Sequence, residues 1–342
     1  MKPQRDLTID TLRGFAIFTM IAANLAGRVL AEPHPLAFRF YGSFAAPLFI
    51  LLAGMMVGFS SLKKSYTFPY FFKRGISVIG MAALLDILVY RTYPFITWDV
   101  LYLIGFSLIA AYLFNPLKIW LKFLIVLMIF ALTPFLQHYL GYLIPIPDLH
   151  SWNEVKLTGA WQIIKRWLID GWFPIFPWLG FSFLGVIFAS LRWAKPEKPT
   201  FRLTLLPGII IFLAGGIYLL MQVGGLVIRE GYSELFYPPT IAYSLTAIGV
   251  IIILFALVDL KPSLLIYRPL QAMGEAALFI YILHLALIEF ALYPFYQNSN
   301  FLTFLLFYLI LLVICIITAY ALRIVRKKWL KPPFLIRMLI GG

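Results

Sequence analysis

An acid and a base stand one helical turn apart where the first long apolar run of this 342-residue chain begins. Asp10 and Arg13 belong to the segment Thr8-Ile9-Asp10-Thr11-Leu12-Arg13-Gly14, and residues at i and i+3 of a helix can neutralise each other on one face. Asn24 and then His34 follow at positions where a plain membrane anchor would carry Leu or Val. We therefore expect this run to be a functional element.

The spacing of these polar residues predicts how they lie. Arg13 and Asn24 are eleven residues apart, which on an ideal helix is three turns plus about 20 degrees and about 16 Å of rise, so they share one face. Pro33 and Pro35 bracket His34 and prevent a regular helix there. His34 is thus predicted to lie on a constrained loop, either as an ordinary loop histidine or as an acid/base group near physiological pH.

Few other strongly polar side chains fall inside the apolar runs, where each is costly and is a functional candidate by default. His284 lies in the middle of such a run, either as a site residue or as a neutral histidine that makes hydrogen bonds between helices. We interpret Asp86 and Glu289 as structural partners or as groups at the rim of the bundle. Glu275 also lies in or beside the run that contains His284.

The composition is that of an integral membrane protein: 62% of the residues are hydrophobic and 12% are charged. Soluble domains have roughly 45–50% and about 25%. Apolar runs recur from end to end, so we expect one all-α domain over residues 1–342, a bundle of about ten transmembrane helices. The predicted spans are 12–31, 42–61, 74–91, 98–115, 118–136, 172–191, 203–222, 240–258, 272–291 and 302–323.

The formal charge of +14 follows the loops between the spans. With the N-terminus in the cytoplasm, the basic residues fall mostly on the cytoplasmic side, the exceptions being Arg28, Arg39, Arg91, Lys156, Lys165, Arg166 and Arg229. This asymmetry predicts that both termini are cytoplasmic and that the number of spans is even. It also accounts for the charge without nucleic acid as a partner.

The longest segment between spans, at about 137–171, is expected on the outer side. Its second half, 152–168, has the spacing of an interfacial amphipathic helix, either a lid over the bundle or a bland anchor. His138 and His150 lie in this region without a third ligand at metal-binding spacing, so no metal is assigned. No Gly-rich phosphate loop supports ATP or NAD chemistry.

Together these pieces resemble the membrane acyltransferases that include heparan-alpha-glucosaminide N-acetyltransferase and its YeiB-type bacterial relatives, and more distantly the acyltransferase-3 family. The residues that carry the resemblance are Asp10-Thr11-Leu12-Arg13-Gly14, Asn24, His34, Ala46-Pro47-Leu48-Phe49-Ile50-Leu51-Leu52-Ala53-Gly54, Trp98-Asp99-Val100-Leu101-Tyr102-Leu103-Ile104-Gly105, Phe176-Pro177-Trp178-Leu179-Gly180 and Gly274-Glu275-Ala276-Ala277-Leu278-Phe279-Ile280-Tyr281-Ile282-Leu283-His284. Each motif alone is weak, but their order covers most of the chain.

The resemblance implies transfer of an acyl group, most simply acetyl, from cytoplasmic acyl-coenzyme A to a hydroxyl or amine of a glycan or amino-sugar acceptor across the membrane. His34 falls where the family has its catalytic histidine, and Asn24 falls at its intramembrane asparagine. We expect His34 to act as general base or to carry the acyl group, and Asn24 to donate to the developing oxyanion. The thioester or the acceptor would also contact His284.

Arg13, Lys73 and Arg74, with Lys63 and Lys64, are expected at the cytoplasmic mouth, where they would bind the coenzyme A phosphates. Most of these are interpreted as charges that set orientation, which leaves Arg13 as the best single candidate for binding coenzyme A. The plasma membrane, with its lipids, is the expected location. Members of the family can dimerise, and no residue here predicts an interface.

One residue departs from the family pattern: Ser43 stands where animal N-acetyltransferases carry an Asp. Either another acid serves or the acceptor chemistry differs. The alternative function is a secondary transporter or a lipid or glycan flippase without chemistry, since polar midplane residues suit it too. A structural or assembly partner in the membrane is a third class, but it would not need Asn24 or His284.

Overall fold

The computed structural model describes residues 5–62, 66–142, 149–193, 204–329 and 331–341. Within these ranges the regular structure is entirely helical, as expected. The longer helices are α1 (Leu7–Val29), α3 (Ala45–Leu62), α4 (Phe68–Leu85), α5 (Val100–Phe114), α6 (Ile119–Leu140), α9 (Ile175–Trp193), α10 (Leu205–Gln222), α11 (Ile241–Leu260), α13 (Ala277–Leu287) and α14 (Phe301–Lys328). The short ones are α2 (Leu36–Gly42), α7 (Trp152–Thr158), α8 (Ala160–Lys165), α12 (Arg268–Glu275) and α15 (Phe334–Leu339), with π-helical turns η1 (Asp86–Tyr90), η2 (Arg166–Asp170) and η6 (Ile288–Leu292).

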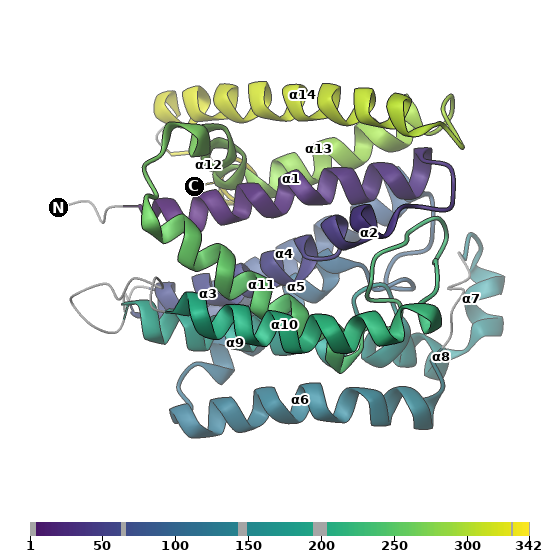
Figure 1. The fold of residues 1–342 in the computed structure, drawn as a ribbon. Coiled ribbons are helices and arrows are strands. Elements are labelled where there is room, and N and C mark those ends of the chain that lie inside the picture. Colours follow the sequence, from purple (N-terminus) through teal and green to yellow (C-terminus); the bar gives the residue numbers. More distant parts are fainter. Residues whose placement is uncertain (1–4, 63–65, 143–148, 194–203, 330, 342) are drawn as a thin grey trace.

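Seven helices in the described ranges are long and apolar enough to cross a membrane, or eight if the bent pair α12–α13 is counted as one span. The expected number of about ten is therefore too high by this measure. Helix α5 has only 15 residues, and α4 carries Lys73 and Arg74 within its 18 residues. Both termini lie at the same end of the bundle (Figure 1), which suits an even number of crossings.

The predicted continuous span 272–291 is broken, because its two halves meet at 83°. Ala276 leaves the helical region, with φ −109° and ψ 30°, between α12 and α13. Just before it, Gly274 packs so tightly on α1 that a Cβ there would lie 2.0 Å from the carbonyl oxygen of Asp10. This close packing fixes α12 across the N-terminal end of α1, and α13 then runs along α1 toward its other end.

Helix α1 lies inside the bundle, and α14 and α6 lie at opposite edges of it (Figure 1). At its first residues, Arg192 of α9 pairs with Asp6 at 2.8 Å and with Asp259 of α11 at 2.7 Å. The hydroxyl of Thr8 donates to the same Asp259 at 2.6 Å. A buried charge pair of this kind needs several partners to offset its desolvation, and this cluster ties three helices together.

Helices α3 and α9 pack backbone to backbone. A Cβ on Gly54 would lie 1.9 Å from the carbonyl oxygen of Ser182, so no larger residue fits there without separating the helices. Small residues at such crossings let helices approach closely where lipid provides no hydrophobic drive. This contact fixes the position of α3, which together with α1 forms the walls of the two cavities described next.

Candidate functional site

An inner cavity of about 600 Å³ opens at the end of the bundle where α1 begins. Its walls come from α1, α3, α4, α5 and the α12–α13 junction. Three arginines, Arg5, Arg13 and Arg74, line it. Three acids, Asp6, Asp10 and Glu275, line it as well, and most of the remaining lining is apolar or aromatic.

The acids at this mouth are bound mainly by arginines other than Arg13. Asp10 accepts from Arg5 Nε at 2.5 Å, whereas Arg13 Nη1 lies 3.8 Å from Asp10, beyond hydrogen-bonding distance. The expected Asp10–Arg13 pair is therefore secondary to the Arg5–Asp10 pair. Glu275 is held by Arg323 at 2.8 and 2.9 Å, and by Arg326. Arg13 thus keeps donors available for an anion in the cavity.

The other basic residues predicted for this mouth lie in different places. Arg74 lines the cavity and donates to the hydroxyl of Tyr70 at 3.1 Å. Lys73 is exposed, outside the cavity lining, and its Nζ lies 4.6 Å from the centre of the Phe334 ring. Lys63 and Lys64 lie outside the described residues.

A second, outer cavity of about 120 Å³ lies toward the other end of α1. Asn24 and Arg28 line it from α1, and Arg28 is paired with Glu289 of η6 at 2.7 Å. One wall is aromatic, and acids surround it: the aromatic residues are Tyr90, Trp172, Phe173, Tyr232, Phe236 and Tyr237, and the acids are Asp86, Asp99, Glu230 and Glu234. Asp86, interpreted from sequence as a structural partner, accepts from the Tyr102 hydroxyl at 2.5 Å.

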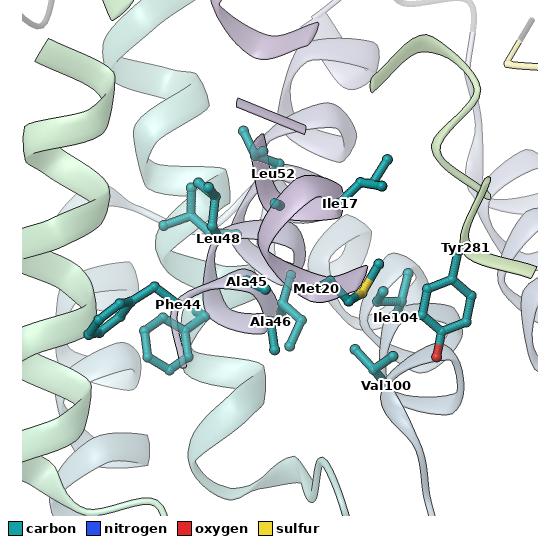
Figure 2. Packing of buried hydrophobic residues seen from close by; sticks show 14 of the residues in the cluster. Ile17, Met20, Phe44, Ala45, Ala46, Leu48, Leu52, Val100, Ile104 and Tyr281 are labelled. Carbon is teal, nitrogen blue, oxygen red and sulfur yellow. The ribbon is translucent and has the colours of Figure 1, made fainter. Parts of the chain in front are cut away.

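The two cavities meet at Phe49 of α3 and Tyr281 of α13, which line both. Figure 2 shows Tyr281 beside Ile104 and Val100 of α5 and near Met20 of α1. The Tyr281 hydroxyl donates to Asp99 at 3.0 Å, which fixes the ring at this junction. These two side chains therefore lie between the basic mouth and the outer cavity.

Asn24 and His284, 260 residues apart in sequence, lie side by side, with Asn24 Nδ2 2.9 Å from His284 Nε2. His284 is fully buried, and its Nδ1 lies 2.9 Å from the carbonyl oxygen of Ile280. Because a carbonyl only accepts, Nδ1 carries the proton and Nε2 accepts from the Asn24 amide. Asn24 lines the outer cavity, whereas His284 does not. His284 instead fixes the side chain of Asn24.

His34 is buried behind the wall of the outer cavity and does not line either cavity. Its Nδ1 lies 2.6 Å from Ser233 Oγ, and its Nε2 lies 3.3 Å from the carbonyl oxygen of Leu30. The carbonyl requires the proton on Nε2, so Nδ1 accepts from the Ser233 hydroxyl. Tyr232 and Glu234, on either side of Ser233, line the cavity. The imidazole therefore contacts the segment Tyr232–Glu234 on the side that faces away from the cavity.

Ser43 is fully buried and forms a hydrogen bond with Leu235, the residue that follows Glu234. Its hydroxyl donates to the carbonyl of Arg39 at 2.6 Å and accepts from the Leu235 N–H at 2.7 Å. Its own carbonyl accepts from the Tyr243 hydroxyl at 2.7 Å. The position that departs from the family pattern is thus a structural anchor in this chain.

The expected amphipathic helix over 152–168 is three shorter pieces. Helix α7 ends at Gly159, whose φ of +78° favours glycine, and α8 and η2 follow. Trp167 of η2 stacks on Trp98 with ring centres 4.8 Å apart, and Trp172, just after η2, lines the outer cavity. Residues 152–168 are themselves not part of the lining of either cavity, whereas Trp172 and Phe173, just after η2, line the outer one. The described residues contain no group of three His, Cys, Asp or Glu side chains placed to hold a metal ion.

Sequence reasoning missed several residues of these cavities. Arg5 lies before the helix, Tyr281 lies in the segment that ends at His284 but was given no role of its own, and Glu234 stands in a loop that no apolar run marks. A usable signal was present for Glu234, because it is the acid within Tyr232-Ser233-Glu234-Leu235-Phe236-Tyr237, a segment otherwise rich in aromatic residues.

Comparison with known proteins supplies the family. No curated protein matches the chain. The model of the family described as heparan-alpha-glucosaminide N-acetyltransferase, catalytic, matches residues 5–223, which contain α1, Asn24, His34 and most of the walls of both cavities. Because this match covers more than half of the sequence, the chain belongs to the heparan-alpha-glucosaminide N-acetyltransferase catalytic family of membrane proteins.

Proposed function

We propose that this membrane protein transfers an acyl group, most simply acetyl, from acyl-coenzyme A on the cytoplasmic side to a hydroxyl or amine of a glycan-type acceptor on the opposite side. The observation that carries the proposal is the pair of cavities that share Phe49 and Tyr281, one with a basic mouth and the other with an aromatic and acidic wall. A transferase that serves two compartments needs a donor cavity and an acceptor cavity that adjoin each other in this way.

The donor would enter by the inner cavity. Arg5, Arg13 and Arg74 offer the charge-assisted donors that bind phosphates, and the apolar cavity beyond them suits the pantetheine arm. The excess of basic residues at this end of the bundle favours the cytoplasm. The plasma membrane is the proposed location, and a homodimer is a proposed assembly.

The reaction would take place near Asn24. Attack by the acceptor on the thioester carbonyl forms a tetrahedral oxyanion, and a fixed amide N–H can stabilise it. One Asn24 N–H is bound to His284, and the second N–H of the same group is oriented by that bond. The C–S bond then breaks, the acyl group stays on the acceptor and coenzyme A leaves as the thiol. His34 contributes in this conformation as a positioning residue, through Ser233.

The acceptor would bind in the outer cavity. Rings such as Trp172, Tyr232 and Tyr237 present flat apolar faces to the C–H groups of a sugar, and the acids around them can accept from sugar hydroxyls or an amine. Glycans and amino sugars are therefore the proposed acceptor class.

Coenzyme A binding tests the donor half of the proposal. Arg13→Ala should weaken coenzyme A binding by about 10- to 100-fold, because a hydrogen bond to a charged group contributes about 1.5–3 kcal/mol. The assay is isothermal titration of purified protein in detergent. Arg268→Ala, an exposed arginine at the same end of the bundle, is the control and should bind normally. Absence of coenzyme A binding by the unsubstituted protein would refute the proposal and favour a transporter.

A further inference from the structure

Glu234 is the one acid of the outer cavity with an oxygen that is buried and unpaired within the described residues. The residue is 7% exposed, it lines the cavity, and its Oε2 has no hydrogen-bond partner there. By contrast, Asp86 accepts from Tyr102, and Asp99 accepts from Tyr281. A buried carboxylate oxygen without a donor is costly and calls for an explanation. A substrate group that supplies the missing hydrogen is such an explanation.

The backbone on both sides of Glu234 is anchored. Ser233 donates its hydroxyl to His34, and its carbonyl accepts from Arg39 Nε at 2.5 Å. Leu235 donates its N–H to Ser43 Oγ. These bonds leave the Glu234 side chain directed into the cavity from a fixed main chain, which is the rigidity that a group acting on a substrate requires.

The carboxylate also lies close to the part of α1 that carries Asn24. A Cβ built on Gly42 would be 3.4 Å from Glu234 Oε1 and 3.1 Å from the Cβ of Ala23, the residue before Asn24. Asn24 and Glu234 line the same cavity of about 120 Å³. An acceptor group bound there can therefore lie between the Asn24 amide, which donates hydrogen bonds, and the Glu234 carboxylate, which accepts them.

We infer that Glu234 is the general base of the reaction, the group that takes the proton from the acceptor hydroxyl or amine. This inference rests on the proposed acyl transfer. The acceptor lone pair forms the new C–O or C–N bond, the thioester C–S bond breaks, the acceptor proton moves to Glu234, and the carboxyl group then gives it to the departing thiolate. Acyl-coenzyme A and acceptor thus become acylated acceptor and free coenzyme A thiol, with no other reactant.

The protonation of Glu234 suits this task. Burial raises its pKa to about 7, against the opposing charge of Arg39 on α2. The titratable loop groups that interact with it are the hydroxyls of Tyr232 and Tyr237, which stay neutral near pH 7 because burial raises their pKa values further. A base with a pKa near the working pH can both accept and return a proton.

The test uses the full-length protein in detergent or vesicles, with acetyl-coenzyme A as donor and glucosamine or water as probe acceptor, and follows release of the thiol. Glu234→Gln should lower kcat by about 10²–10⁴-fold. The KM for acetyl-coenzyme A should stay unchanged. In the unsubstituted protein kcat/KM should fall below about pH 7, and this fall should be absent from the residual activity of the variant. Glu32→Gln, the same change at an exposed acid, is the control.

A second variant separates chemistry from folding. Glu234→Ala should regain turnover when formate is added, because a small carboxylate can occupy the vacated space and accept the proton. Normal turnover by Glu234→Gln, or a loss that formate does not restore while coenzyme A still binds, would overturn the role of Glu234 and leave the proposed function standing. Absence of turnover by the unsubstituted protein would instead overturn the proposed function, and this inference with it.

Discussion

Replacement of His284 by leucine removes the only acceptor that the described structure gives to the Asn24 amide inside the bundle, at 2.9 Å. A buried donor without a partner costs about 1–3 kcal/mol. Asn24 is half-buried on the cavity wall and can avoid this cost by rotating its amide, so its second N–H no longer points to the oxyanion position. Loss of one oxyanion donor lowers kcat by about 10²–10³-fold. We therefore expect a loss of about 10²-fold for His284→Leu.

The assay is a double-mutant cycle on thiol release from acetyl-coenzyme A. Asn24→Ala alone should lose about 10²–10³-fold, and the double variant should be no slower, because His284 acts only through Asn24. His284→Gln is the matched control: its side-chain oxygen can accept from Asn24, so kcat should stay within about tenfold of normal, or 1.36 kcal/mol. Additive losses in the double variant, or equal losses for Leu and Gln, would refute the argument that His284 orients Asn24.

Three further predictions concern other parts of the molecule. His34→Asn, whose oxygen can still accept from Ser233, should keep more turnover than His34→Ala, with coenzyme A binding intact in both; equal losses in kcat would indicate that the ring itself is the base. Gly54→Ala should lower the free energy of unfolding by about 1–3 kcal/mol in thermal melts, whereas Gly80→Ala, where a Cβ meets no atom within 4 Å, should not. Glu234→Gln should raise the melting temperature more at pH 8 than at pH 5. Burial raises the pKa of this carboxyl from 4.5 to about 7, so it lowers stability progressively as the pH rises between these values and most strongly above them; a similar gain at both pH values would be evidence against the raised pKa.

The fold class and the functional element could be predicted from local properties of the sequence. Apolar runs of spanning length predicted an all-helical membrane protein, since lipid leaves backbone groups no partners outside the helix. The same runs overestimated the number of spans, because hydropathy does not reveal that Ala276 breaks one helix or that α5 is short. Beside this break Gly274 packs against the α1 backbone, a contact between segments distant in sequence.

For the site, sequence alone determined that Arg13 and Asn24 share a helix face, because helical periodicity fixes that relation within one segment. Only tertiary structure decided what they face. It set His284 against Asn24 and placed Phe49 and Tyr281 in the walls of both cavities. It also placed His34 behind Ser233. Such relations depend on how helices pack and on how loops are anchored between them, and those energies arise from contacts across hundreds of residues that no local pattern records.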